Sequence, residues 1–544
     1  MNGFVKANTF DAGVNGTRTE NGAISYANFG TELMNQFGKA GAYRGRDIQA
    51  VWDEQARLWG ENPELALKFP FYLRLITRQT TVNGDKTEKV QKGQGARDEA
   101  FKRLLWIAKY HPTEFYRNLW LLPVVGSWKD LWVLMAFDGA GEYLNWDKFY
   151  AIIAEGINNS STRELVKKYM PRIRSNSKCK TPWAVRTNVL AKAFAKTVGW
   201  SFEEYRKYKA TGIAHKFQTV ICKGLYDKIN WKEIPGKALL NLVSGGFLNR
   251  HSLEEAYLNW LDSQPVAKFN GYPFELGRKV NAAGWNGPSL VQKVTIDKQF
   301  KNLIETAKKD GTPIKGNVLC ALDTSGSMSG PLMDKSGTAP IDVCISLGIY
   351  FSELNQGAFH NVVAMFDNVS TFKTLKGDSF CDKWSDIMHT TTAWGSTNVL
   401  SIVNLMLDTR RKHPEIPIED YPFTWIVVSD MQFNPTNRRD YKGNALVEQS
   451  TYEAIQSMLR AEFPDEVVDN LRIVWWYCAN RETSDFPATM DMPGMYMVSG
   501  FDGALISTLL GGELKSDENG KIIFPTMEEI VEQSLNQEVL ALVQ

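Results

Sequence analysis

The chain lacks a hydrophobic run long enough to cross a membrane, and it lacks closely spaced cysteine pairs. No apolar stretch approaches the roughly 20 residues that a transmembrane helix needs, and the first residues, MNGFVKANTFDAG, have no secretion-signal pattern. The six cysteines are scattered without a CxxC motif, which predicts free thiols and neither a disulfide framework nor a zinc site. We therefore expect a cytoplasmic protein with no membrane partner.

The sequence also lacks the common catalytic motifs. It has no GxxxxGK[ST] phosphate-binding loop, no GxSxG turn of the kind that carries a nucleophilic serine, and no HExxH pair among its histidines. An aspartyl phosphatase usually has a second acid two residues after its nucleophile, and after Asp323 that position is Ser325. We expect a protein that is not an enzyme.

The chain as a whole lacks an excess of either charge, because its formal net charge is only +1. Its positive charges are nevertheless concentrated in one segment. Between Arg163 and Lys237 there are 18 lysine and arginine residues and 5 acidic residues. Cations bind phosphates and aromatic rings stack on unpaired bases, so this segment favours nucleic-acid binding with little sequence choice. A solvated helical surface is the alternative. The candidate stacking residues in this segment are Trp183, Trp200, Tyr205 and Tyr208.

Two parts of the chain differ in the period of their apolar residues. Residues 1–310 follow helical spacing with short Gly, Pro or Ser breaks and no convincing strand alternation, which predicts stacked helical pairs (an α-solenoid) or an irregular helical bundle. Pro63 is expected near a helix start, and Pro70 is expected to kink or divide that helix. In residues 311–544, short runs such as NVLCALD and FTWIVVSD are apolar on both faces and alternate with helices. This pattern predicts a doubly wound parallel sheet, so the fold class is α + α/β.

Polar side chains gather where the apolar runs of the second part end. In NVLCALDTSGSMSG the run ends at Asp323, and Ser325 and Ser327 follow at alternate positions. Thr397 precedes a helix, and Asp430 ends another apolar run. Ligands bind beyond the carboxyl ends of parallel strands, and two carboxylates with three hydroxyls suit a hard cation, Mg²⁺ or Mn²⁺. The alternative is that these residues only cap helices.

This set resembles the metal-ion-dependent adhesion site of von Willebrand factor A domains, in which D-x-S-x-S is followed by a threonine and then an aspartate. Asn398 follows the threonine where many A domains have an acid, which lowers the charge of the site. The resemblance implies metal ligation by Asp323, Ser325, Ser327, Thr397 and Asp430, and a von Willebrand A fold for residues 311–544.

A helical module followed by an A domain resembles the TROVE-type Ro autoantigen proteins. GQGARDEAFKRLLWIAKYHP is similar to their Gly/Arg-rich helix opening, and LLPVVGSWKDLWVL to their G-x-W-K-D-L segment. The chain is more similar still to a sister group of uncharacterised proteins with the same layout, in segments such as NPELALKFPFYLRL and MVSGFDGALI. The resemblance implies a HEAT-like helical ring that binds single-stranded or small structured RNA.

The candidate RNA-binding residues are six of the cations of the basic segment: Arg172, Arg174, Lys178, Lys180, Arg186 and Lys192. The sequence thus predicts a non-enzymatic RNA-binding protein with a magnesium-binding A domain. The alternative is a scaffolding protein whose bound metal contacts an acidic residue of a protein partner.

Overall fold

The chain forms two compact units, each of which combines segments that are distant in sequence. The sheet unit consists of Met1–Gly45 and Ile234–Gln533, and the helical unit consists of Arg46–Glu233 and Ser534–Gln544. The predicted boundary between residues 310 and 311 lies outside the described residues and stays a prediction. The computed structural model describes residues 16–20, 22–81, 88–211, 216–309, 317–330, 337–366, 370–390, 398–433, 451–479, 486–501, 515–516, 522–523 and 525–544.

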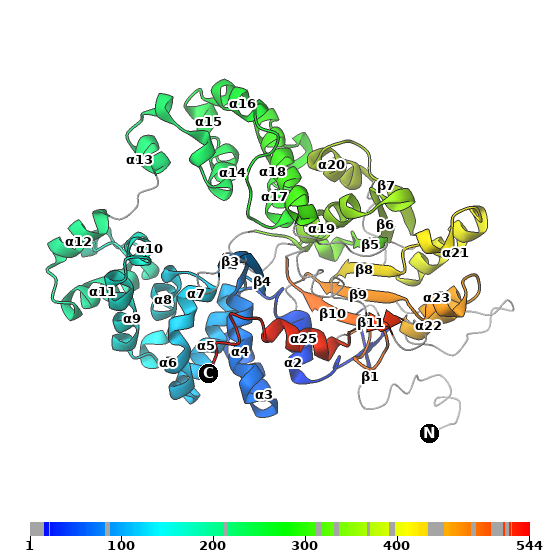
Figure 1. The fold of residues 1–544 in the computed structure, drawn as a ribbon, viewed down its shortest axis with the longest axis horizontal. Coiled ribbons are helices and arrows are strands. Elements are labelled where there is room, and N and C mark those ends of the chain that lie inside the picture. The colour runs from blue at the N-terminus through cyan, green and yellow to red at the C-terminus, as the bar shows by residue number, and fades with distance from the viewer. Residues whose placement is uncertain are drawn as a thin grey trace. The chain divides into compact units, whose positions relative to one another are not determined.

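A six-stranded, mostly parallel sheet forms the centre of the sheet unit (Figure 1). The strand order is β10-β9-β8-β5-β6-β7, and of these strands β7 alone is antiparallel to its neighbour. The strands are β5 (Val318–Asp323), β6 (Val362–Phe366), β7 (Thr371–Thr374), β8 (Thr424–Ser429), β9 (Arg472–Tyr477) and β10 (Met495–Ser499). Short antiparallel pairs are formed by β1 (Gly16–Arg18) with β2 (Ile24–Tyr26) and by β11 (Lys515–Ser516) with β12 (Ile522–Ile523).

The central strands are covered on both faces. Every residue of β5, β8, β9 and β10 is buried, although successive side chains of a strand point to opposite faces. This burial explains why the sequence runs are continuously apolar, and it confirms the predicted mixed α/β class with a mostly parallel sheet. The helices of this unit are α2 (Glu32–Lys39), α14 (Gly236–Ser244), α15 (Phe247–Arg250), α16 (Glu254–Asp262), α17 (Pro273–Asn281), α18 (Leu290–Lys309), α19 (Pro340–Leu354), α20 (Phe380–Thr390), α21 (Leu400–Lys412), α22 (Thr451–Leu459), α23 (Asp465–Val468) and α25 (Met527–Leu535), whose end belongs to the helical unit.

Helix α19 packs against the centre of this sheet and is itself covered by α17. It is buried almost all round, as expected for a helix between a sheet and an outer layer. The close approach of α17 requires Gly277, because a Cβ atom there would lie 2.2 Å from the Ser346 Oγ and 2.4 Å from Cζ3 of Trp384. Helix α2, from the beginning of the chain, packs against β9 and β10.

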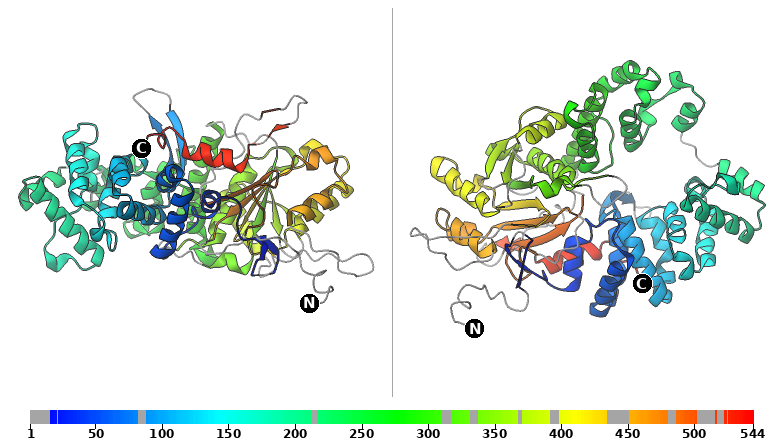
Figure 2. Two further views of the ribbon diagram at one scale, coloured as in Figure 1. Left: turned by 90° about the horizontal axis from the view of Figure 1, so that it is seen from below. Right: turned by 180° about the vertical axis from the view of Figure 1, so that it is seen from behind.

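Helices that follow one another in sequence pack together in the helical unit. The colour therefore changes steadily from blue to green along this unit in Figures 1 and 2. Its helices are α3 (Ile48–Glu61), α4 (Pro63–Arg74), α5 (Arg97–Tyr110), α6 (Pro112–Asn118), α7 (Leu122–Val125), α8 (Trp128–Met135), α9 (Trp146–Asn158), α10 (Arg163–Tyr169), α11 (Pro182–Thr197), α12 (Phe202–Ala210) and α13 (Lys216–Cys222).

Two local expectations differ from the structure. Helix α4 starts at Pro63 as predicted, and it continues through Pro70, which lies between the buried side chains of Phe69 and Phe71. Of the two expected effects of Pro70, the division is therefore wrong, and the kink stays a prediction. A proline lacks the N–H that would bond to the carbonyl four residues back, and here that carbonyl, of Ala66, accepts a hydrogen bond from Nε2 of Gln55 at 3.0 Å. The helical unit also contains an antiparallel hairpin, β3 (Ile76–Thr81) with β4 (Glu88–Gln94). These strands are rich in polar residues, so they lack the apolar alternation by which strands are recognised.

The cysteine prediction is confirmed, because all six cysteines are free thiols. Among the described residues, no helix combines the length and the hydropathy that a bilayer span requires. Four of the thiols are buried in the sheet unit, where they pack as small apolar side chains: Cys320, Cys344, Cys381 and Cys478.

A buried ion pair fixes the start of helix α8. Asp130 is fully buried, and its Oδ2 accepts hydrogen bonds from Nη2 of Arg74 (2.6 Å) and from the backbone N–H of Ser127 (2.7 Å). Its Oδ1 lies 3.0 Å from Nε of Arg97. One carboxylate thus joins α4, the start of α5 and the N-terminus of α8.

Replacing Asp130 should therefore destabilise the helical unit. Asp130→Ala leaves Arg74 buried without its carboxylate partner, and breaking a buried pair in this way costs about 3–5 kcal/mol. The matched control is Asp138→Ala, which removes the partner of Arg186 from an exposed pair and should cost no more than about 1 kcal/mol. Urea unfolding followed by circular dichroism measures both, and equal losses would contradict the role of Asp130.

Candidate functional site

The structure brings two predicted metal ligands to one edge of the sheet. Asp323 is the last residue of β5, and Asp430 directly follows β8. These strands are parallel neighbours, with Leu322 opposite Val428, so both aspartates leave the sheet at the same end. From β5 the chain adds β6 and β7 on one side and then β8, β9 and β10 on the other, so β5 and β8 form the topological switch point, where open α/β sheets bind ligands.

Hydrogen bonds hold these side chains in tight turns. Asp323 accepts the backbone N–H of Ser325 at Oδ1 (2.9 Å) and the hydroxyl of Ser429 at Oδ2 (2.6 Å). The hydroxyl oxygens of Ser325 and Ser327 are 3.0 Å apart. Asp430 Oδ1 accepts the backbone N–H of Gln432 at 3.3 Å.

Burial and like charge dominate the electrostatics of this edge. Asp323 is 0% exposed and Asp430 is 1% exposed. Burial, and then the negative charge of Asp430, raise the pKa of Asp323 to about 6, against hydrogen bonds from Ser429 and Ser325 that lower it. Two neighbouring buried carboxylates destabilise one another, and a cation bound between them would offset that repulsion.

The donor set suits a hard cation in its chemistry, because it consists of carboxylate and hydroxyl oxygens. Among the described residues, no group of three or more His, Cys, Asp or Glu side chains could hold a metal, so any ligation here relies on the hydroxyls of Ser325 and Ser327. Thr397 lies outside the described residues.

The sequence reasoning missed Ser429 at this edge. Its hydroxyl donates to Asp323 and accepts the backbone N–H of Met431 at 3.0 Å. Met431 has a φ of 64°, a left-handed conformation that is uncommon for residues other than glycine. The Ser-Asp pair at the end of an apolar run was the available signal, because a hydroxyl there can fix a turn.

The predicted RNA-binding cations lie on or next to helix α11 of the helical unit. Arg172 and Arg174 lie in the extended segment after α10, and Lys178 and Lys180 precede α11; all four are exposed. No ion pair of these four is found among the described residues. The other two cations have partners: Arg186 Nη1 is 3.0 Å from Oδ1 of Asp138, and Lys192 Nζ donates to Oδ1 of Asn176 (3.1 Å).

The candidate stacking residues of this segment differ in their exposure. Trp183 is 41% exposed at the start of α11. Tyr205 is instead fully buried, and its hydroxyl donates to the carbonyl of Pro171 at 2.8 Å, so it cannot offer a stacking face. Trp200 packs against Tyr208 with ring centroids 4.8 Å apart. Spacing along the sequence did not separate the surface tryptophan from the core tyrosine.

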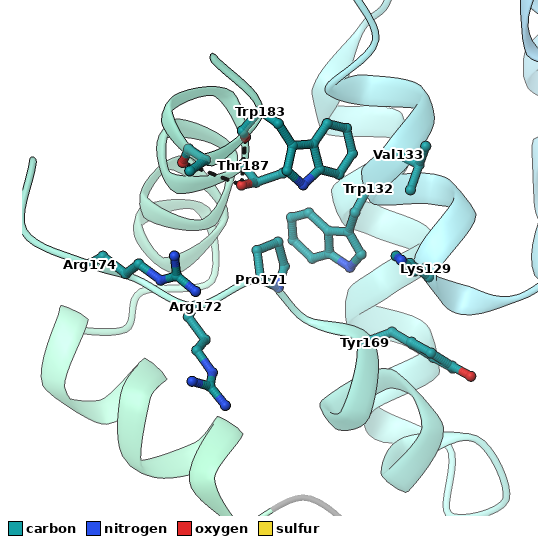
Figure 3. A pocket seen from close by; sticks show the side chains of 10 residues that line it. Lys129, Trp132, Val133, Tyr169, Pro171, Arg172, Arg174, Trp183 and Thr187 are labelled. Atoms are coloured by element: carbon teal, nitrogen blue, oxygen red, sulfur yellow. Dashed lines mark hydrogen bonds between the residues drawn. The ribbon is translucent and has the colours of Figure 1, made fainter. Parts of the chain in front are cut away.

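A cavity of about 200 Å³ opens beside these cations (Figure 3). Arg172, Arg174 and Trp183 line it together with Lys129 and Trp132, which lie upstream of the basic segment and were missed for that reason. In Figure 3, Pro171 lies at the centre, the two arginines lie on one side and Lys129 lies on the other. The remaining lining residues are Val133, Tyr169, Ala184 and Thr187.

The cations of this region affect one another. Lys209 Nζ donates to the carbonyls of Lys167 (3.1 Å) and Lys168 (3.3 Å) at the end of α10. Burial, and then the charge of Arg172, lower the pKa of Lys209 from 10.5 to about 8. The positive charge of Arg172 thus adds to the effect of burial on Lys209.

Comparisons with known proteins found sequence similarity for residues of both units. Residues 317–540 match a family model described as a domain of unknown function, DUF7788. This range begins just before β5 and includes Asp323 and Asp430. An uncharacterized protein of Acanthamoeba polyphaga mimivirus is 22% identical over 533 residues, which cover 91% of this chain and 84% of the viral protein.

The lowered pKa of Lys209 predicts a pH dependence of stability. Between about pH 8 and 10.5 the unfolded chain binds a proton at Lys209 that the folded chain does not, so the free energy of unfolding rises with pH over this interval. Lys209→Met should lack this contribution, whereas Lys207→Met, an exposed lysine of the same helix, should keep it. Urea unfolding across this interval at low salt measures the difference, and parallel pH profiles for the two variants would refute the assignment.

Proposed function

We propose that this chain is a non-enzymatic, cytoplasmic RNA-binding protein of the Ro type, in which a HEAT-like helical unit binds RNA and a von Willebrand A-like unit binds Mg²⁺. The observation that carries the RNA proposal is the group of exposed cations before α11, namely Arg172, Arg174, Lys178 and Lys180, which have no ion pair among the described residues. Solvated helical surfaces usually mix both signs of charge, whereas this one accumulates a single sign. Phosphates supply the missing counter-charge.

The Mg²⁺ proposal rests on the strand order and the oxygen donors. Asp323 and Asp430 lie at the switch point of a sheet whose strands, counted along the chain from β5, are ordered 3-2-1-4-5-6. This arrangement with a D-x-S-x-S loop is what the resemblance to A domains implies. We propose that Asp323, Ser325, Ser327, Thr397 and Asp430 hold the ion.

A second candidate function is a protein scaffold, and the strand-end cluster favours it. RNA binding by exposed cations does not account for two buried carboxylates at a switch point. A Mg²⁺ ion held there would keep water ligands, one of which an acidic residue of a partner protein could replace. Such a contact should be lost with EDTA and in Asp323→Asn, whereas RNA binding should survive both.

The salt dependence of RNA binding should become weaker when Lys178 and Lys180 are replaced. For a single strand, the logarithm of the binding constant falls with the logarithm of salt concentration by about 0.7 per neutralised phosphate, so Lys178→Ala/Lys180→Ala should reduce the slope by about 1.4. The matched control is Lys308→Ala/Lys309→Ala, two adjacent exposed lysines at the end of α18. Fluorescence anisotropy with labelled oligouridine between about 50 and 200 mM salt gives the slopes. Equal slopes for the two double variants would exclude this surface.

Mg²⁺ should stabilise the wild-type protein against thermal unfolding. An ion present at about 100 times its dissociation constant stabilises the folded state by about 2.7 kcal/mol, so the melting temperature should rise on adding Mg²⁺. Asp323→Asn and Asp430→Asn should abolish the rise, because each removes a charged ligand while preserving side-chain shape. Asp297→Asn, which changes a half-buried carboxylate of α18, should keep it. A Mg²⁺-dependent rise that persists in both strand-end variants would disprove the site.

A further inference from the structure

The cavity beside α11 combines positive charge with flat apolar surfaces. Its ten lining residues include three cations, Lys129, Arg172 and Arg174, and no acidic residue. They also include three aromatic side chains: Trp132, Tyr169 and Trp183. Like charges around a cavity repel one another, so this composition favours an anionic ligand with a planar apolar part.

The floor of the cavity is rigid. Trp132 is 2% exposed, and its ring packs edge-on against Phe194, with centroids 5.7 Å apart. Helix α8, which carries Trp132 and Lys129, is held at its start by the buried carboxylate of Asp130. Pro171 adds a second apolar surface at the centre of the cavity (Figure 3). These surfaces are therefore formed before a ligand binds.

Trp183 forms part of the rim, and its backbone is fixed. The side chain of Thr181 accepts the N–H of Ala184, which caps α11, and Pro182 occupies the first turn. The Thr187 hydroxyl donates to the Trp183 carbonyl at 2.9 Å. No ring contact of Trp183 is found in the part of the chain that the structure describes, and its side chain is 41% exposed.

The volume limits what the cavity can hold. At about 200 Å³ it is smaller than the roughly 300–1,000 Å³ of pockets that enclose drug-sized ligands. It therefore accommodates one planar group, with the charged part of the ligand left at the rim among the exposed side chains of Arg172, Arg174 and Lys129.

We propose that this cavity binds one unpaired nucleotide of the RNA, with its base stacked on Trp183 above Pro171 and Trp132 and its flanking phosphates bound by Arg172, Arg174 and Lys129. The proposal rests on the RNA-binding function proposed above and adds to it a site for a single base. Stacking on an indole tolerates all four bases, so the site recognises single strands rather than a sequence.

Two observations favour a nucleotide over other anions. Inorganic phosphate would use the cations and leave the exposed indole of Trp183 without a role. An acidic peptide offers a planar group of this size only where it contains an aromatic residue, whereas every nucleotide carries a planar base next to its phosphate. Burial lowers the pKa of Lys209 most, and the charge of Arg172 lowers it further, so Arg172 contributes a positive potential next to the cavity that a phosphate would neutralise.

The test compares two labelled oligomers by anisotropy: oligouridine and an abasic oligomer with the same number of phosphates. Wild-type protein should bind the base-containing oligomer about 5- to 150-fold more tightly, which is the range expected for loss of one base–aromatic stack. Trp183→Ala should lose this preference without changing the salt slope, and Trp183→Phe should retain most of it. The matched control is Trp120→Ala, because Trp120 is 45% exposed in the same unit and does not line the cavity.

The outcomes separate this inference from the function on which it rests. If both oligomers bind equally and Trp183→Ala behaves as Trp120→Ala, the nucleotide site is wrong while salt-dependent RNA binding stands. If neither oligomer binds to wild-type protein, both proposals fail. A labelled acidic peptide that binds with the same dependence on Trp183 would replace the nucleotide as the ligand. Circular dichroism melting of each variant establishes that it is folded.

Discussion

The parallel pairing of β5 with β8 organises the sheet unit. All later strands of the sheet extend outward from this pair, β6 and β7 on one side and β9 and β10 on the other. The chain therefore reverses its direction of winding at this point, and open α/β sheets bind ligands at such switch points. The same pairing buries Asp323 next to Asp430, and the low polarity there raises the pKa of Asp323.

The two units share one physical property, like charges that lie close together. In the sheet unit the charges are two buried carboxylates. In the helical unit they are exposed cations, four of which are without an ion pair among the described residues. Like charges held close together lower the stability of a fold, and a counter-ion from outside the chain offsets that cost. A hard cation suits the first group and phosphates suit the second.

Preorganisation distinguishes the cavity beside α11 from an ordinary basic surface. The ion pair of Asp130 with Arg74 fixes α8, and the capping hydroxyl of Thr181 fixes α11, so Trp132 and Trp183 occupy set positions at the cavity. A surface that is already ordered loses little conformational entropy when a ligand binds. In the proposed nucleotide site, the cations would supply attraction that depends on salt, and the aromatic surfaces would supply attraction that does not.

The sequence by itself determined the features that depend on local pattern. Continuous apolar runs indicated a mostly parallel sheet, scattered cysteines indicated free thiols, and the order of Asp323 and Asp430 at strand ends indicated one shared edge. Charge counting located the basic segment, but it could not tell that Arg186 is paired with Asp138 or that Tyr205 is buried.

Only the tertiary structure decided which distant residues meet. The polar hairpin β3–β4 and the undivided helix through Pro70 depend on packing, which hydrophobic periodicity does not record. The same holds for Lys129 and Trp132, which join Arg172 and Trp183 around one cavity although about 40 or 50 residues separate them in the chain. Periodicity and charge counts describe neighbours along the chain, whereas a binding site is formed by neighbours in space.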